Sequence, residues 1–250
     1  MSLNQLSIAA QEVAIELAEI SRRGPIPAVG HGDKCVGMTL MDQLGMQHTV
    51  DAKPRYKGLV ISARRGTRFV DVNRVNLFAK VPDWEVSVCK SSREIVDKFG
   101  YDRDDARKLY CTISARQPNS QSLQLRIDRD NQLLREQFIS SDGSREDVAA
   151  WKIGKLKERL ANAHPESAWI VASSSIRGGV EHFHFRFAQF TSSPRVDELP
   201  DLLEAGTVTV DHLIMTKSGQ TTDKGPLFKI KPANVSALFP ASARFDLMAL

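Results

Sequence analysis

The chain has 250 residues, 42% of them hydrophobic and 26% charged, which is the composition of an ordinary globular protein with an ample core. Its net charge of only +4 excludes a uniformly basic protein, so any basic surface has to be local. Three cysteines without metal-ligand spacing, no signal-like start and no apolar run of about eighteen residues predict a soluble, cytoplasmic protein that avoids membranes.

The first half of the chain predicts helices followed by a buried strand. Apolar residues at helical spacing predict a helix over about 4–22. A short helix is expected from Asp33, as its cap, to Gly45, which ends it. The apolar, β-branched run Leu59–Ala63 then predicts a central strand buried on both faces.

The residues after this strand predict the rest of one sheet. A turn is expected over Arg64–Thr67, a returning strand over Phe69–Asn73, and an extension of the sheet over Val75–Phe78. Further strands are predicted over about 109–114, 123–128, 131–134, 168–176, 180–190, 208–215 and 227–231. Helices are predicted over about 92–99, capped at its start by Ser91, and over about 145–163 and 200–205. This order predicts a mixed α/β fold forming a single compact domain over residues 1–250, with room for two lobes.

A concentration of positive charge surrounds the predicted central strand. Residues 53–68 contain six lysines and arginines and no acid, which favours an anionic partner such as a polyphosphate. Arg64, Arg65 and Arg68 are therefore candidate phosphate contacts, in or beside the predicted turn. The competing interpretation is a solvated basic turn.

Short motifs over nearly the whole chain carry a family resemblance. The chain resembles the MvaI/BcnI restriction endonuclease family, MutH-like members of the PD-(D/E)XK superfamily. This resemblance implies a restriction-endonuclease-like mixed β-sheet flanked by helices, with the two lobes placed around a DNA-binding cleft. The matching segments, in family order, are Asp33–Gly37, Gly45–Gln47, Asn76–Pro82, Lys98–Tyr101, Lys108–Ile113, Lys152–Leu156, Glu181–Phe185 and Asp223–Pro226.

The resemblance also implies a magnesium site whose residues are missing here. Nucleases of this superfamily hold Mg²⁺ with an Asp and a Glu-x-Lys, because the hard cation prefers carboxylate oxygens and the lysine helps to activate water. Aligned without gaps, the five site positions hold Arg55 for the Asp, Val60 for the Glu, Ser62 for the Lys, Met41 for a supporting helix carboxylate and Ala79 for a frequent His. We expect no catalytic residues and no metal at these positions, and Arg55 is a candidate for holding a DNA phosphate in place of the metal.

The loop 217–225 resembles the part of the family that reads DNA bases. Lys217, Thr222, Asp223 and Lys224 are the candidate DNA-binding residues, with Asp able to accept from cytosine and Lys able to donate to guanine. An ordinary flexible polar loop is the alternative.

These observations predict binding of double-stranded DNA, without cleavage or cofactor, by an inactive relative of these endonucleases. One alternative is an active, Mg²⁺-dependent type II endonuclease or nickase with a site rebuilt from Asp42, Asp51 or Asp71. The other is a scaffold subunit of a restriction or defence system that binds a protein partner. His182 and His184 could bind zinc, but the residue spacing favours a structural role.

Overall fold

The computed structural model describes residues 3–47, 55–68, 73–239 and 243–250. The chain forms two compact units: unit 1 draws on 1–73, 163–194 and 235–250, and unit 2 on 74–162 and 195–234. The chain therefore enters each unit more than once, and each unit is described by itself. The expected strand over 69–73 and the acids Asp51 and Asp71 lie outside the described residues, apart from Asn73.

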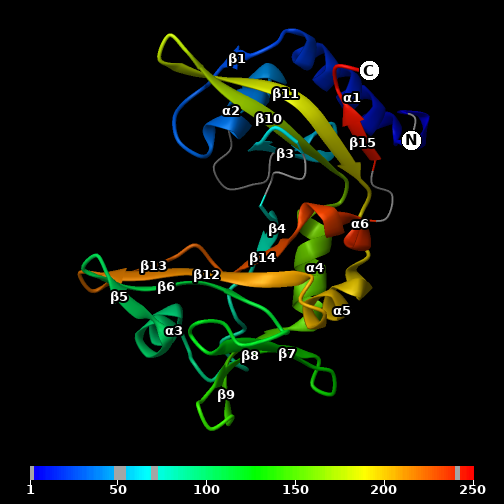
Figure 1. Cartoon of the computed structure of the whole chain (residues 1–250). Coiled ribbons are helices and arrows are strands. Elements are labelled where there is room, and N and C mark those ends of the chain that lie inside the picture. Colours follow the sequence, from blue (N-terminus) through cyan, green and yellow to red (C-terminus); the bar gives the residue numbers. More distant parts are fainter. Residues whose placement is uncertain (1–2, 48–54, 69–72, 240–242) are drawn as a thin grey trace. The chain divides into compact units, whose positions relative to one another are not determined.

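Unit 1 is built on a mixed sheet. Its strand order is β1 (Ile26–Pro27), β11 (Val180–Thr191), β10 (Ser167–Arg177), β3 (Leu59–Arg65) and β2 (Arg55–Tyr56), with β15 (Ala243–Asp246) also paired to β11 (Figure 1). Strand β3 runs parallel to β10, and the other pairs are antiparallel. Leu59, Val60 and Ile61 are each at most 3% exposed, which confirms the prediction of a strand buried on both faces.

Two helices cover one face of this sheet. Helices α1 (Ile8–Arg22) and α2 (Cys35–Gln43) contribute Leu17 and Leu40 to the core that also holds Leu59 and Ile61 of β3. The short segments Leu3–Gln5 and α6 (Val235–Leu238) complete the helical part of unit 1.

The two ends of α2 differ in how well the sequence predicted them. Gly45 has a positive φ of 66° just after the helix, and its N–H donates to Asp42, as expected for a terminating glycine. The expected cap by Asp33 is wrong, since Lys34 occupies the cap position without a side-chain bond and the Asp33 carboxylate instead lies 3.9 Å from Arg65 Nη1.

Unit 2 contains an antiparallel sheet in the order β4 (Val75–Ala79), β14 (Leu227–Ile230), β12 (Val208–Lys217), β6 (Ala106–Ile113) and β5 (Tyr101–Arg103), with β13 (Gln220–Asp223) paired to β12 (Figure 1). The expectation that residues 75–78 extend the sheet of β3 is wrong. Strand β4 pairs with β14 instead, and the ring of Phe78 stacks on that of Phe228 at 4.6 Å.

The sheet of unit 2 has one packed and one open face. Along β12 the even-numbered residues 208–214 are fully buried, whereas Thr209, Leu213 and Met215 are partly exposed. The packed face contacts α3 (Ser92–Phe99) and α5 (Leu199–Glu204), and its His212 bonds to Glu136 in a second sheet of β7 (Leu123–Asp128), β8 (Leu133–Ile139) and β9 (Arg145–Lys152). We call the other side, which carries Thr209, Asp211, Leu213, Met215 and Lys217 with their cross-strand partners, the open face.

The predicted helix over 145–163 is wrong in its first half. Residues 145–152 form β9, and only Ile153–Ala163 form a helix, α4. The four consecutive residues 148–151 are each at most 2% exposed, and backbone N–H groups of Asp83 and Cys89 donate to carbonyls of this strand. A strand with partners on both edges buries such a run, whereas an amphipathic helix exposes part of it.

Other features bear on the expectations for the whole chain. Ser91 caps α3 by accepting from the N–H of Glu94, as the sequence predicted. Within the described ranges, no helix is long and apolar enough to cross a membrane. Cys35, Cys89 and Cys111 all carry free thiols.

Candidate functional site

The β2–β3 ladder brings together three residues at the positions where the family resemblance implies a metal site. Arg55 of β2 lies directly across from Val60 of β3, and cross-strand partners project to the same face. Side chains alternate along a strand, so Ser62 and Arg64 share that face, while Leu59 and Ile61 project into the core under the helices. We call Arg55, Val60, Ser62 and Arg64 the site face.

The side chains of the site face do not fit a magnesium ion. Mg²⁺ is bound in proteins through carboxylate oxygens, and a guanidinium, an isopropyl group and a hydroxyl supply none. The neighbouring strand β10 places Ser167, Trp169 and Val171 beside β3, which adds no acid. Among the described residues, no three His, Cys, Asp or Glu side chains form a group that could hold a metal.

The remaining positions of the implied metal site do not supply ligands either. Met41 is a buried thioether of α2, and Ala79 ends β4 in unit 2. Asp42, which the alternative of a rebuilt site would use, is exposed on α2 and accepts a hydrogen bond from Gln43.

Lys57 and Arg65 of the basic stretch 53–68 are paired with acids of the protein itself, contrary to expectation. Lys57 Nζ lies 2.6 Å from Glu12 and 2.8 Å from Glu16, both on α1. Arg65 pairs with Glu181 of β11. These acids lie far away in the sequence, so a scan of the stretch alone could not reveal them.

Arg64 and Arg65 end strand β3 instead of forming the predicted turn, and they project to opposite faces. Arg65 Nε donates to Glu181 Oε1 at 2.9 Å, Nη2 donates to the Gly32 carbonyl at 2.8 Å, and the guanidinium lies 5.2 Å from the ring centre of Phe183. The bond from Arg65 lowers the pKa of Glu181 to about 2. Arg65 therefore joins β3, β11 and the segment before α2, which is a structural role.

The other predicted cations are differently placed. Arg64 is half-buried on the site face, and burial lowers the pKa of its guanidinium, which remains charged at neutral pH. Arg55 and Arg68 are exposed. Arg55 and Arg64 thus give the site face a positive charge where the family resemblance implies a bound cation.

The expected loop 217–225 is mostly a β-hairpin. Strands β12 and β13 pair Lys217 with Gln220 and Met215 with Thr222. Between them, Ser218 and Gly219 have φ values of 50° and 77°, as in the two-residue turns that match the twist of a hairpin. Lys217, Gln220 and Thr222 are exposed and share the open face. Gln220 was not among the residues predicted to bind DNA, although Ser-Gly between alternating residues is a hairpin signal.

Asp223 projects to the packed face and is engaged within the protein. Ser92 Oγ donates to Asp223 Oδ2 at 2.5 Å, and the N–H of Gly225 donates to Oδ1 at 2.8 Å. The carboxylate therefore joins the hairpin to the first residue of α3 and shapes the following turn. Lys224 is exposed, and its backbone N–H donates to the Leu213 carbonyl.

Beside the hairpin, the open face carries the ring of Tyr110 and a charge cluster. Tyr110 is 45% exposed next to Met215. Asp211 accepts from Arg74 at 2.8 Å and lies 2.8 Å from Lys229 Nζ. Burial raises the pKa of Asp211, but these two cations outweigh it and keep the pKa below its usual value.

The two candidate zinc ligands, His182 and His184, both lie on β11. His184 Nε2 lies 3.1 Å from the Ser21 carbonyl, which holds the ring against the end of α1. No third ligand joins His182 and His184 among the residues that the structure describes.

Comparison with known proteins identifies the fold and the family. A solved structure described as "Restriction endonuclease MvaI-cognate DNA substrate complex" matches with a TM-score of 0.76 and 20% identity, over 97% of this chain and 99% of that chain. "Restriction endonuclease MvaI in the absence of DNA" matches with a TM-score of 0.54 and 19% identity, over 97% and 98%. No curated protein sequence matches the chain. The mixed α/β fold is that of restriction endonuclease MvaI. The MvaI/BcnI restriction endonuclease family matches residues 15–239, and the chain belongs to this family.

Proposed function

We propose that this protein binds double-stranded DNA at preferred sequences and does not cleave it at the β2–β3 site. The observation that carries the proposal is the pairing of Arg55 with Val60, with Ser62 on the same face, at the positions where the family resemblance implies a carboxylate metal site. Family membership and a similar structure described as a DNA substrate complex support DNA as the partner.

The site face offers a chemical substitute for a metal ion. A guanidinium is a fixed positive charge that can donate two parallel hydrogen bonds to phosphate oxygens. Arg55 and Arg64 would therefore hold a backbone phosphate, but neither can generate a metal-bound hydroxide. Such a site keeps affinity for the substrate backbone and lacks the means to attack it.

The β12–β13 hairpin would read the bases. A two-stranded β-ribbon fits the major groove, where glutamine can pair with adenine and lysine can donate to guanine. Lys217, Gln220 and Thr222 project from one face of the hairpin, with Lys224 following it. Asp223, engaged with Ser92 and Gly225, would support the hairpin instead of accepting from cytosine.

The proposal is tested by comparing two cations of the β2–β3 hairpin, Arg55 and Lys57. After selection of a preferred duplex from a random pool, Arg55→Gln should weaken binding to every duplex and reduce the slope of log affinity against log salt by about 1. Lys57→Asn is the matched control. It removes the same charge two residues away, from a side chain paired with α1, and asparagine tolerates its φ of 49°.

Fluorescence anisotropy at several salt concentrations measures both quantities. Equal effects of the two substitutions would contradict a specific phosphate contact at the site face. Failure of the wild-type protein to bind any duplex would contradict the proposed function itself.

A further inference from the structure

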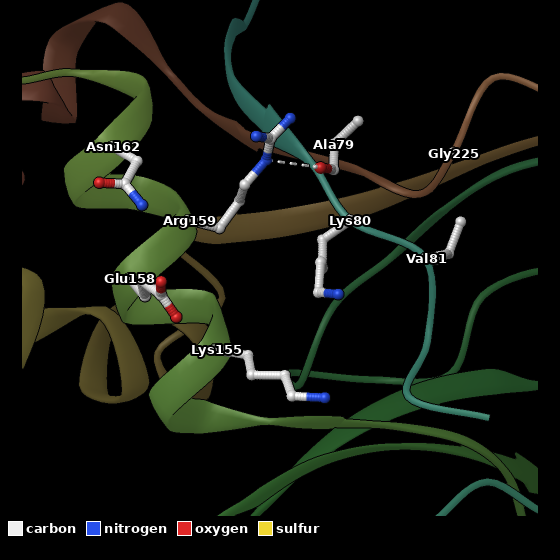
Figure 2. A pocket seen from close by; sticks show the side chains of 8 residues that line it. All are labelled: Ala79, Lys80, Val81, Lys155, Glu158, Arg159, Asn162 and Gly225. Carbon is white, nitrogen blue, oxygen red and sulfur yellow. Dashed lines mark hydrogen bonds between the residues drawn. The ribbon is translucent and has the colours of Figure 1, made fainter. Parts of the chain in front are cut away.

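Unit 2 contains an open pocket of about 520 Å³ between α4 and the end of β4 (Figure 2). Two segments that matched the family motifs, 76–82 and 152–156, meet at this pocket, and none of the functions described above uses it. Its lining consists of Ala79, Lys80, Val81, Lys155, Glu158, Arg159, Asn162 and Gly225.

One wall is the outer face of α4. Lys155 precedes Glu158 and Arg159 by three and four residues, and Asn162 follows them by four and three, which places all four in a row along one side of the helix (Figure 2). The buried residues between them, among them Leu156 and Leu160, hold the opposite side of the helix in the core. The row is therefore fixed by packing behind it.

The other wall is held through its backbone. The N–H of Lys80 donates to the Pro226 carbonyl at 3.1 Å, and the Lys80 carbonyl accepts from Trp151 Nε1 at 2.8 Å. Trp151 is fully buried, so the main chain at Lys80 is anchored while its side chain extends along the pocket (Figure 2). Gly225 lies beside Ala79, two residues after the end of the β12–β13 hairpin at Asp223.

The cations of the pocket have separate tasks. Lys155 Nζ lies 2.7 Å from the Asp83 carboxylate, whose side chain is only 3% exposed. The negative charge of Asp83 therefore largely compensates the positive charge of Lys155. Arg159 Nε donates to the Ala79 carbonyl at 3.3 Å, which orients the guanidinium and directs Nη1 and Nη2 away from that carbonyl (Figure 2). Lys80 and Arg159 thus supply the available positive charge from opposite walls, and Glu158 is the one acid in the lining.

We propose that this pocket binds a backbone phosphate of duplex DNA through Arg159 and Lys80. The proposal rests on the function proposed above and adds a second anchoring point, in unit 2. No aromatic side chain lines the pocket, so it lacks the platform that a nucleobase needs and suits a charged backbone. Because Gly225 lies only two residues after Asp223, where the β12–β13 hairpin ends, a phosphate held here would fix the register in which the hairpin meets the bases.

Three substitutions in the pocket test the proposal. Arg159→Ala should weaken binding to all duplexes on the order of 10-fold, and both Arg159→Ala and Lys80→Ala should reduce the salt slope by about 1. Glu158→Gln should act in the opposite direction and tighten binding, because it removes a carboxylate that repels phosphate. A purely structural role of the pocket would not give effects of opposite sign at neighbouring positions.

Controls separate the phosphate contact from general charge and from folding. Lys157→Ala removes a cation from the same helix, but that lysine is paired with Asp197 outside the pocket lining, so the salt slope should change little. Arg159→Lys keeps the positive charge but loses the planar guanidinium that can donate two parallel hydrogen bonds. This variant should therefore retain the salt slope and lose part of the affinity.

The outcomes distinguish this proposal from the one on which it rests. If the wild-type protein binds duplex DNA and both Arg159→Ala and Lys80→Ala bind it with the same affinity and salt slope, only the proposal about the pocket is overturned. Absence of duplex binding by the wild-type protein would overturn both.

Discussion

Replacing Glu136 with alanine should lower the free energy of unfolding by about 3–5 kcal/mol, because removing one partner of a buried ion pair leaves the other uncompensated. Glu136 Oε2 lies 2.9 Å from His212 Nε2, and both side chains are 0% exposed. The second polar atoms of this pair, Glu136 Oε1 and His212 Nδ1, have no hydrogen-bond partner in the part of the chain that the structure describes. Each of these two side chains therefore depends on the other to offset the free-energy cost of its burial.

Chemical denaturation of the wild type and Glu136→Ala measures this loss. Glu85→Ala is a suitable control, since it removes a glutamate from an exposed pair with Lys152 and should change stability little. A similar, small effect at both positions would contradict the interpretation that the Glu136–His212 pair is a buried, interdependent contact.

The same pair should make stability depend on pH. Burial lowers the pKa of His212, but the facing Glu136 outweighs burial and raises this pKa above its ordinary value. A group whose pKa is raised in the folded state stabilises the protein fully at pH values below its pKa in the unfolded state, which is about 6.5 for histidine. This stabilisation is lost as the pH rises through the pKa of the folded state. The wild type should therefore lose stability above about pH 6.5 more steeply than the uncharged Glu136→Gln/His212→Gln variant. Parallel pH profiles would show that His212 does not titrate in this way.

If the β12–β13 hairpin reads the bases as proposed, removing its exposed side chains should abolish much of the sequence preference. Gln220→Ala and Lys217→Ala should each reduce discrimination between the selected duplex and scrambled duplexes by about 1–3 kcal/mol, the value of a good base contact in the major groove. Non-specific affinity should change little for Gln220→Ala, because a neutral amide contributes no counterion release.

Binding of each variant to both kinds of duplex at one fixed salt concentration measures this effect. Lys98→Ala is the charge control for Lys217, because Lys98 is an exposed lysine of α3, on the packed side of the sheet. Equal losses on all duplexes would place the hairpin among the backbone contacts. Unchanged binding would place it outside the DNA interface.

Features that depend on local sequence were predictable. The buried strand at 59–61, helix α1 and the cap at Ser91 follow from periodicity and capping chemistry within a few residues. The prediction that Arg55, Val60 and Ser62 stand at the metal-site positions needed only the family resemblance and the residue identities at those positions, and it stays a prediction.

Features that depend on distant partners were not predictable. Strand β4 joins the sheet of unit 2 because of β14, which lies about 150 residues later in the sequence. Arg65 becomes structural through Glu181, and residues 148–151 become a strand through contacts with Asp83 and Cys89. In each case tertiary contacts override the local pattern.

The most direct test of the central proposal is cleavage of a plasmid that carries the selected site. Supercoiled plasmid is incubated with an excess of the protein and Mg²⁺ or Mn²⁺, and nicked and linear products are separated on a gel. The proposal predicts that the plasmid stays supercoiled although the same preparation binds the site. Metal-dependent nicking by the wild type, lost on replacing Asp51 or Asp71, would contradict it.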